Sequence, residues 1–356
     1  MNHARNAEIS ALVKRSASQA GFDLAGIAPA TDSRELQSFP DWIAAGHAGE
    51  MKYMESRDEQ GSLKRASLSR VAPWARSVVV CAINYNTGHP YSTQFNDPSH
   101  GWISRYAWSQ EDYHEAVLRR LKQVEAALHQ AINDSHPQLM TRSYVDTGPI
   151  VERVFAKYAG VGWIGKNTCI INQKLGSWLF LGVILTSLEL APDVPAPDRC
   201  GTCTRCIEAC PTDAILEPYK LDANRCISYL TIEKRGSIPE DLRAGMGRHV
   251  FGCDICQDVC PWNRKAPATT AAEFSPRPGL VNPALDWLTE LSPDEFRNTF
   301  RGSPIRRAKP AGLRRNALLA IGNSGNRHFL PLAERLTRDE DDSVAEAARW
   351  ASTRLR

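Results

Sequence analysis

The sequence predicts an α+β protein built in three consecutive parts, and three observations lead to that fold class. A continuous run of β-branched and apolar residues, Ser77 to Tyr85, lies among stretches with helical periodicity in the first half of the chain. Eight of the ten cysteines are concentrated between residues 200 and 260. From Pro304 to the end, apolar residues recur at helical spacing between short turns.

We place the three parts at residues 1–190, 191–270 and 271–356. The first boundary is the stretch Ala191 to Asp198, whose three prolines disfavour a regular helix or strand. A chain of 356 residues is long enough for several parts with their own hydrophobic cores. Hydrophobic residues at 42% and charged residues at 23% are ordinary proportions for a globular protein.

Within these parts, periodicity predicts the individual elements. Helices are expected at residues 8–20, 36–55, 112–130 and 150–158, and in the last part at 310–321, 327–336 and 343–355. Strands are expected at residues 22–28, 77–85 and 142–145, with a strand pair split by a loop within 177–190. The run at 77–85 is typical of a strand that is buried on both faces.

The cysteines lie in two runs with a specific spacing. The first is C-x2-C-x2-C-x3-C-P, from Cys200 to Pro211, and the second is C-x2-C-x3-C-P, from Cys253 to Pro261. The first spacing is that of bacterial ferredoxins, in which the fourth cysteine ligates the other [4Fe–4S] cluster. Cys226 is the only nearby thiol that can complete the second run. The pattern therefore predicts two clusters.

The ligands are assigned from this spacing. The first cluster takes Cys200, Cys203, Cys206 and Cys260, and the second takes Cys210, Cys226, Cys253 and Cys256. A zinc ribbon and a disulfide framework are the alternatives, but zinc needs only four ligands. Cys81 and Cys169 are left over and are interpreted as small buried hydrophobes. Thiolate clusters and a start without an apolar signal core predict a cytoplasmic protein.

Asp146 is the candidate general acid, because it follows a predicted strand in Tyr-Val-Asp-Thr-Gly-Pro. Position alone favours another role, that of an N-cap for the following helix. Asp112-Tyr-His114 begins like the Asp-x-His-x-x-Gly motif of some cobalamin enzymes, but Val117 replaces the glycine. We therefore interpret His114 as a helix-face histidine. Neither GxGxxG nor a P-loop occurs in the right context, so NAD, FAD and ATP are disfavoured.

Four strings of the sequence resemble the epoxyqueuosine reductase family, over nearly the whole chain. They are Tyr144–Pro149, Gly160–Asn167, Cys226–Glu233 and Gly252–Asn263. The resemblance implies a nitroreductase-like domain with base-off cobalamin, a ferredoxin-like domain with two [4Fe–4S] clusters, and a C-terminal HEAT-like helical repeat. It also implies an activity, the reduction of the epoxide of epoxyqueuosine at the tRNA anticodon wobble position to queuosine.

The resemblance also implies residue roles. Asp146 matches the proton donor of the family, and the eight cysteines match the cluster ligands. Cobalamin contacts are implied for Arg57, Asp146, Trp163, Lys166, Asn167 and Ser228. The family lacks a histidine ligand to cobalt, which agrees with the incomplete motif at His114. The implied partners are a tRNA with a queuosine-type anticodon and an external low-potential electron donor, and we expect a monomer that does not bind membranes.

The end of the chain is basic. Residues 301–356 carry twelve Lys and Arg against six Asp and Glu, whereas the whole chain has a net charge of +3. Seven of those basic residues lie between Arg301 and Leu330 with no acidic residue among them. Contacts with tRNA phosphates are predicted for Arg306, Arg307, Arg314 and Arg315. The alternative is an ordinary solvated helix face.

Two other functions are compatible with the cysteine pattern. A cobalamin-dependent reductive dehalogenase also couples two clusters to cobalt, but it would be expected to carry a twin-arginine export signal, and it has no use for a basic helical tail. A ferredoxin-type electron carrier would need only the middle part, with the first part docking its partner. Cobalamin absorbance and tRNA binding would distinguish the three functions.

Overall fold

The computed structural model describes residues 2–132 and 136–356. Contacts group the described residues into two compact units. Unit 1 comprises Met1–Asn86, Tyr113–Cys203 and Pro261–Ala271, and unit 2 comprises Thr87–Asp112, Thr204–Cys260 and Ala272–Arg356. This grouping differs from the predicted division into three consecutive parts, because most of the cysteine-rich segment belongs to the same unit as the C-terminal helices.

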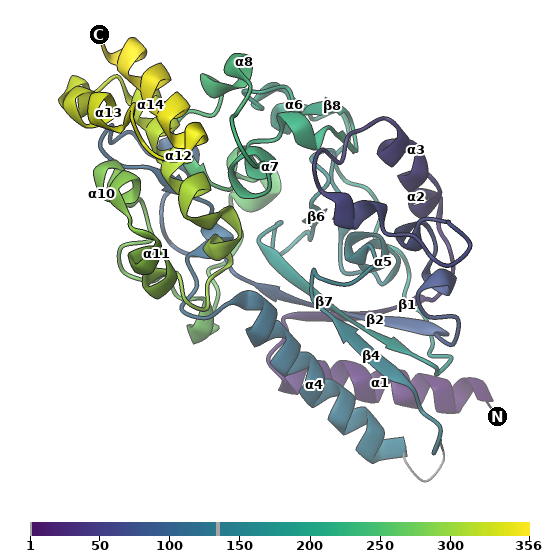
Figure 1. Cartoon of the computed structure of the whole chain (residues 1–356). Helices are drawn as coiled ribbons and strands as arrows, with labels where there is room; N and C mark the ends of the chain where they lie inside the picture. The colour runs from purple at the N-terminus through teal and green to yellow at the C-terminus, as the bar shows by residue number, and fades with distance from the viewer. Residues whose placement is uncertain (1, 133–135) are drawn as a thin grey trace. The chain divides into compact units, whose positions relative to one another are not determined.

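Unit 1 is organised around a four-stranded antiparallel sheet with the order β1-β2-β7-β4 (Figure 1). Its strands are β1 (Leu24–Pro29), β2 (Ser77–Asn84), β7 (Leu179–Thr186) and β4 (Thr141–Tyr144). β2 pairs with β7 along its whole length, from Ser77 opposite Thr186 to Asn84 opposite Leu179. Every residue of β2 is buried, which confirms the prediction from its β-branched run.

Helices cover both faces of this sheet (Figure 1). α1 (Asn2–Gln19) and α4 (Tyr113–Ile132) pack on one face, and α5 (Glu152–Tyr158) packs on the other. Gly182 lets α4 approach closely, because a Cβ there would lie 2.8 Å from the Leu121 side chain. On the opposite face Val78 and Val80 join Phe155 of α5 in one hydrophobic core. The start of α4 and the start of α5 are therefore fixed on the same sheet.

Two predicted elements of unit 1 are wrong in detail. The helix expected over residues 36–55 is broken into α2 (Arg34–Gln37), α3 (Phe39–Ala44) and a 3₁₀ turn at Lys52–Glu55. Gly46 and Gly49 interrupt it with φ angles of +72° and +59°, which a continuous α-helix cannot contain. The strand pair expected within residues 177–190 is the single strand β7. A short hairpin, β5 (Trp163–Ile164) with β6 (Ile170–Ile171), completes the unit.

Unit 2 combines short elements around the cysteines with the C-terminal helices. Its strands are β3 (Trp102–Ile103), β8 (Ile215–Glu217), β9 (Lys220–Leu221) and β10 (His249–Phe251). Its helices are α6 (Arg205–Glu208), α7 (Ile227–Ile232), α8 (Glu240–Arg243), α9 (Ile255–Asp258), α10 (Leu285–Glu290), α11 (Pro293–Thr299), α12 (Lys309–Ser324), α13 (Leu330–Leu336) and α14 (Asp342–Leu355). Trp102, Phe251, Leu285 and Leu313 share one core, so all three segments of unit 2 fold together.

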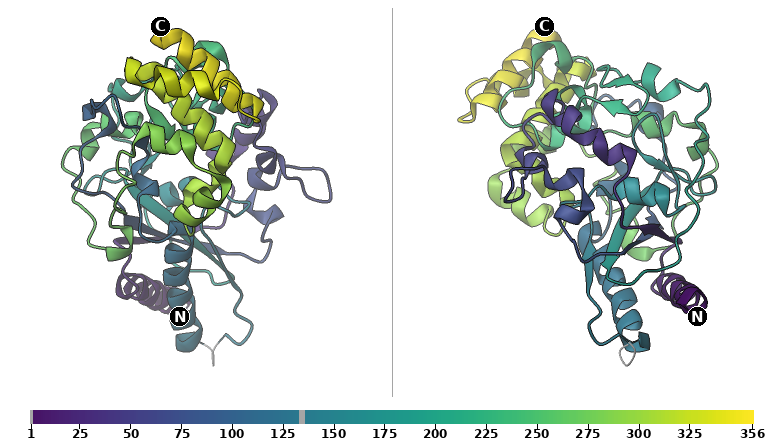
Figure 2. Two further views of the ribbon diagram at one scale, coloured as in Figure 1. Left: turned by 60° about the vertical axis from the view of Figure 1, so that its left-hand side comes forward. Right: turned by 90° about the vertical axis from the view of Figure 1, so that its right-hand side faces the viewer.

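The three helices at the end of the chain lie side by side, with α14 against both α12 and α13 (Figures 1 and 2). Their bounds confirm the helices predicted for this part. Gly325 ends α12 in the left-handed conformation, with φ of +65°, and the Asp341 side chain caps the start of α14. Within the described residues, no helix has the length and apolar character needed to cross a membrane.

Candidate active site and cysteine sets

Asp146 stands in the turn that follows β4, on unit 1. Its φ angle of +56° lies in the left-handed region, where non-glycine residues are uncommon, and its side chain is 63% exposed. The Thr147 N–H donates to the Val145 carbonyl at 2.5 Å, and the Arg65 guanidinium donates to the Gly148 carbonyl at 3.0 Å. These contacts fix the turn and present the Asp146 carboxylate outward.

The start of α4 supplies the partners of this carboxylate. The Tyr113 hydroxyl donates to Asp146 Oδ2 at 3.0 Å, and His114 Nε2 lies 3.5 Å from the same oxygen. The Tyr113 ring stacks on Phe180 of β7, with ring centroids 4.4 Å apart. His114 above all, and then Tyr113 and the charge of Arg153, lower the pKa of Asp146, and they outweigh the partial loss of water around the carboxylate where these side chains contact it. Asp146 is therefore an ionised carboxylate at neutral pH.

The structure tests one of the two roles considered for Asp146, that of an N-cap. α5 begins after Val151, and no side chain caps its first turn. The N-cap interpretation of Asp146 is therefore wrong. The interpretation of His114 as a simple helix-face histidine was incomplete, because its ring contacts Asp146. The sequence carries no local signal for that contact, since the two residues lie on elements far apart in the chain.

A second carboxyl group, which the sequence analysis did not single out, lies close to Asp146. Glu152 is on the first turn of α5, and burial raises its pKa from 4.5 to about 7. The negative charge of Asp146 raises the pKa further, whereas Arg153 and Arg65 lower it. Its surroundings therefore favour the protonated form of Glu152, whereas those of Asp146 favour the ionised form.

Arg65 connects this part of the site to the preceding loop. It lies in the 3₁₀ turn Lys64–Ala66 and is only 9% exposed. Its guanidinium donates to the Tyr53 carbonyl at 2.6 Å and to the Gly148 carbonyl at 3.0 Å. Burial lowers its pKa, but the charges of Glu152 and Asp146 oppose that effect. Arg65 thus adds a positive charge, held by two backbone carbonyls, near the Glu152 and Asp146 carboxyl groups.

The residues implied as cofactor contacts have different surroundings. Arg57 is exposed and donates to the Gly61 carbonyl at 2.7 Å. Trp163 is 3% exposed and packs edge-to-face on Trp262, and its Nε1 has no hydrogen-bond partner in the part of the chain that the structure describes. Asn167 is buried and accepts a hydrogen bond from the Cys169 N–H at 3.2 Å. Ser228 lies on α7 in unit 2.

Lys166 is engaged within unit 1. Its ammonium group donates to the Gly201 carbonyl at 2.7 Å and to the Cys203 carbonyl at 3.0 Å. It therefore connects the loop after β5 to the first two cysteines of the first run. The sequence analysis assigned Lys166 to the cofactor, and the structure gives its side chain this second role.

Replacing Lys166 by methionine is expected to loosen residues 200–203, because a hydrogen bond from a charged group contributes about 1.5–3 kcal/mol. Amide hydrogen exchange of Cys203, whose N–H donates to the Cys200 carbonyl at 3.1 Å, should become at least about tenfold faster. Lys174→Met is the matched control, since Lys174 is exposed in the following turn. Equal exchange rates in both variants would contradict the anchoring role.

The cysteines can be compared with the predicted cluster ligands. All ten are free thiols in the structure, which contains none of the pairs that a disulfide framework would need. No three histidine, cysteine or acidic side chains among the described residues converge as the ligands of a single metal ion would. A [4Fe–4S] cubane differs from a single ion, because each thiolate binds a different iron.

Members of the second set lie close together in unit 2. Burial and then the neighbouring thiol of Cys226 raise the pKa of Cys253 well above its usual range, and Cys210 adds to the effect. Burial likewise raises the pKa of Cys226, to which Cys210 contributes. Such a group of partly buried thiols, whose negative charges would repel one another as thiolates, fits iron as the positive partner. Of the first set, Cys200 and Cys203 belong to unit 1 and Cys206 and Cys260 to unit 2. The assignment of ligands to each cluster stays a prediction for both sets.

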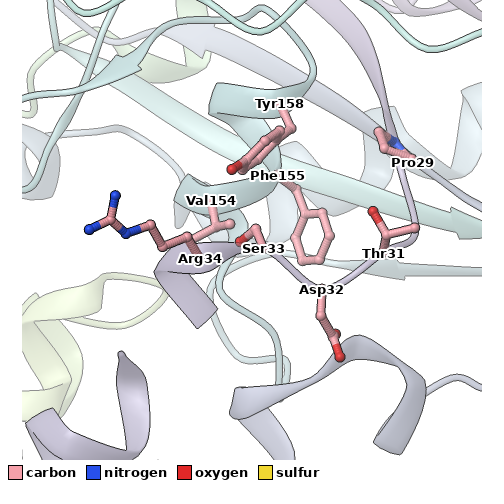
Figure 3. Close-up of a pocket in the computed structure, with 8 residues that line it drawn as sticks. All are labelled: Pro29, Thr31, Asp32, Ser33, Arg34, Val154, Phe155 and Tyr158. Atoms are coloured by element: carbon pink, nitrogen blue, oxygen red, sulfur yellow. The ribbon is translucent and has the colours of Figure 1, made fainter. Parts of the chain in front are cut away.

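A small cavity lies between helix α5 and the segment that follows β1. Figure 3 shows it between the end of β1 and α5, with Arg34 and Tyr158 at its margin. Its volume is about 210 Å³, below the roughly 300–1,000 Å³ of typical ligand pockets. Nearby, Lys157 and Tyr158 both contact the Glu35 carboxylate, at 2.5 and 3.0 Å. The cavity is therefore too small for a corrin.

Comparisons with known proteins identify the family. A family described as a 4Fe-4S double cluster binding domain matches residues 199–263, and one described as epoxyqueuosine reductase QueG matches residues 65–147. The epoxyqueuosine reductase of Synechocystis is 45% identical over 82% of this chain and 98% of its own length. That of Gloeobacter violaceus is 42% identical over 90% of this chain and 98% of its own.

Solved structures agree with these matches. An epoxyqueuosine reductase crystallised with an epoxyqueuosine-modified tRNA-Tyr stem loop has a TM-score of 0.85 and 30% identity, over 98% of this chain and 90% of that chain. The Bacillus subtilis epoxyqueuosine reductase, with its catalytic aspartate loop swung out of the active site, has a TM-score of 0.84, at 29% identity and with the same coverage.

An α+β fold with a double-cluster domain at residues 199–263 defines an iron–sulfur oxidoreductase. The chain belongs to the epoxyqueuosine reductase family, as the four strings in its sequence predicted. Membership over most of the chain decides against a separate electron carrier and against a dehalogenase.

Proposed function

We propose that the chain reduces the epoxide of epoxyqueuosine, at the wobble position of a tRNA anticodon, to the alkene of queuosine. Family membership supports the reaction, and the relative crystallised with a modified tRNA stem loop supports the substrate. The observation on this chain that carries the proposal is the outward-facing Asp146 carboxylate, held by Tyr113 and His114. It stands in a loop of the kind named catalytic in the Bacillus subtilis relative.

The reaction needs two electrons and two protons, because the epoxide oxygen leaves as water and a double bond forms. In our proposal an external low-potential donor supplies the electrons, and two [4Fe–4S] clusters would carry them when bound. Their ligands are the two cysteine sets assigned from the sequence. When bound, cobalamin supplies a low-potential cobalt centre for reduction of the epoxide. Arg57, Asp146 and Trp163 keep polar atoms that it could contact, whereas the side chains of Lys166 and Asn167 are engaged within the chain.

In the proposed reaction, Asp146 transfers the proton. Opening of the epoxide leaves an alkoxide, and a positioned carboxylic acid can protonate it. Because Asp146 is ionised in this structure, it must take up a proton before it can donate one. Tyr113 and His114 orient its carboxylate for both steps, since both contact Oδ2 and leave Oδ1 for the transfer.

The proposed activity is tested with purified, cluster-loaded chain under anaerobic conditions. A stem loop that contains epoxyqueuosine is incubated with the chain, cobalamin and a chemical low-potential reductant, and the nucleosides are analysed by mass spectrometry. We expect conversion to queuosine. No conversion by fully loaded protein would contradict the proposal.

The basic tail is the proposed tRNA contact, but the structure changes which residues we assign to it. Arg315 is 2% exposed, and its guanidinium donates to the carbonyls of Leu230, Lys234 and Gly236. That residue holds α12 against the segment after α7 and is not available to a phosphate.

The other three predicted arginines differ in exposure. Arg314 pairs with Asp339 at 2.5 Å in a largely buried contact, and Arg307 pairs with Glu233 at 2.5 Å. Arg306, which precedes Arg307 in the chain, is exposed. We therefore propose Arg306, together with the exposed Arg301 and Lys309, as the phosphate-binding group of unit 2.

Replacing Arg301, Arg306 and Lys309 by glutamine is expected to weaken tRNA binding and flatten its salt dependence. Each lost phosphate contact should reduce the slope of log affinity against log salt by ~0.7–0.9. The control changes two other exposed arginines of unit 2, Arg335 and Arg338. Salt titrations of stem-loop and full-length tRNA binding provide the measurement, and equal slopes in all proteins would show an ordinary solvated face.

A further inference from the structure

The turn that carries Asp146 is held by contacts with other segments of unit 1. Residues 145–150, between β4 and α5, form neither helix nor strand. The contacts from α4 act on the Asp146 side chain alone. The backbone of the turn is held at Gly148, whose carbonyl accepts a hydrogen bond from the Arg65 guanidinium at 3.0 Å. Arg65 therefore fixes the backbone two residues after Asp146.

The same guanidinium also holds the loop from which it comes. Its other terminal nitrogen donates to the Tyr53 carbonyl at 2.6 Å, and its central carbon lies 5.8 Å from the centre of the Tyr53 ring. Within residues 53–65, Arg57 forms an isolated β-bridge with Leu63. All of these residues belong to unit 1. The loop is therefore closed by Arg65, and it carries Arg57, the proposed cofactor contact.

The shape of the arginine side chain suits a connection between two backbone segments. A guanidinium is planar and presents its N–H groups in a fixed fork, so that it can donate to two carbonyls at once. Arg65 is buried, and a buried cation is strongly disfavoured unless its donors are satisfied. Displacement of either segment would leave one arm of the fork without its acceptor, and a hydrogen bond from a charged group would be lost. We therefore expect the two segments to keep one fixed separation.

We propose that Arg65 is a positioning residue that sets the place of Asp146 relative to Arg57. This inference rests on the proposed function, in which Asp146 transfers the proton and Arg57 contacts cobalamin when it is bound. Proton transfer needs the carboxylate within hydrogen-bond reach of the reacting oxygen, and a displacement of about 1 Å can slow a reaction about 100-fold. By holding the turn to the loop, Arg65 keeps the acid at a constant distance from the cofactor contact.

Amide hydrogen exchange measures both segments without any turnover. The reporters are the Thr147 N–H, which donates to the Val145 carbonyl in the turn, and the Lys64 N–H, which donates to the Ser56 carbonyl in the loop. In Arg65→Ala both amides should exchange at least about tenfold faster, because each segment loses a hydrogen bond from a charged group. Exchange in β2 should stay at the wild-type rate, which shows that unit 1 remains folded.

Arg120→Ala is the matched control. The Arg120 guanidinium also donates to two backbone carbonyls of unit 1, those of Ala20 and Gly21, at 3.0 and 2.6 Å. Its loss should leave both reporter amides unchanged. Arg65→Lys provides a second variant at the site, because lysine keeps the buried charge but lacks the fork. At least one of the two amides should exchange faster in Arg65→Lys than in the wild type.

The connection itself is tested by loosening the loop at a point that Arg65 does not contact. Asp58 accepts hydrogen bonds from the N–H groups of Gln60 and Ser62, at 3.0 and 2.9 Å. Asp58→Ala should speed exchange at Thr147 by at least about twofold in the wild-type background. It should have no effect there in Arg65→Ala, where the connection to the turn is already lost. No effect in either background, or an equal effect in both, would overturn the inference.

Single-turnover reduction separates the inference from the function on which it rests. In Arg65→Ala the rate should fall by about tenfold or more, because the acid is misplaced, whereas the affinity for a modified stem loop should not change. A wild-type rate, or wild-type exchange at both amides in Arg65→Ala and Arg65→Lys, would overturn the inference but keep the function. Faster exchange at both amides in a chain that reduces no epoxyqueuosine would contradict the function and support the connection.

Discussion

Asp146→Asn is expected to slow single-turnover reduction of epoxyqueuosine by about 10²–10⁴-fold, the usual contribution of a positioned acid–base group. Asparagine keeps the shape of the side chain and can still accept the hydrogen bond from Tyr113, which lies 3.0 Å from Oδ2 in the wild type. It cannot take up and release a proton at neutral pH. Binding of tRNA and the iron content should therefore be unchanged.

The matched control for this variant is another aspartate paired with a histidine. Asp97 Oδ2 lies 2.8 Å from His100 Nδ1 in unit 2, and both side chains are partly exposed. Asp97→Asn removes the same charge from the same kind of pair but outside the candidate site, so the rate should stay at the wild-type value. Rapid-quench measurement with a modified stem loop distinguishes the two variants. A wild-type rate for Asp146→Asn would return Asp146 to a structural role in its turn.

Cys226→Ala is expected to remove the second cluster and, with it, turnover supported by the external donor. Cys226 is the only member of its set that lies outside the two runs. The Cys226 thiol helps to raise the pKa of Cys253, and Cys210 helps to raise the pKa of Cys226, so the three thiols are neighbours. With one of four ligands missing, the iron content should fall by about half, because the other cluster has its own ligands.

Electron paramagnetic resonance of the reduced protein, together with iron analysis, measures this loss. Cys81→Ala provides the control, since Cys81 is fully buried in β2 and belongs to neither run. Its iron content and both cluster signals should match the wild type. If Cys226→Ala also keeps the full iron content and two signals, another residue must complete the second set.

Local sequence patterns predicted the regular elements where one type of interaction dominates. The β-branched run at Ser77 identified β2, because such residues favour a strand and a continuous apolar run requires burial on both faces. The apolar stripe from Val117 identified α4 in the same way. The segment after Leu36 was predicted less well, because periodicity does not register the positive φ angles at Gly46 and Gly49.

The site could be predicted only in part, for a physical reason. Asp146 follows from its motif, but Tyr113 and His114 reach it from a helix more than thirty positions earlier. Glu152 resembles the many acidic residues that favour the first turn of a helix in solvent, and only its burial makes it unusual. Arg315 likewise resembles its exposed neighbours in the basic tail until the fold buries it.

The joint core of unit 2 has a consequence for biosynthesis. Asn316 donates to the carbonyls of Thr231 and Val250, both at 2.9 Å, so α12 closes over the segments that follow Cys226 and precede Cys253. Chains emerge from the ribosome N-terminus first, and α12 is among the last elements to appear. The thiols of the second set are therefore synthesised well before the core around them can close. During that interval the thiols are open to oxidation, and a chain truncated before α12 would lack the Asn316 contacts that close this part of unit 2.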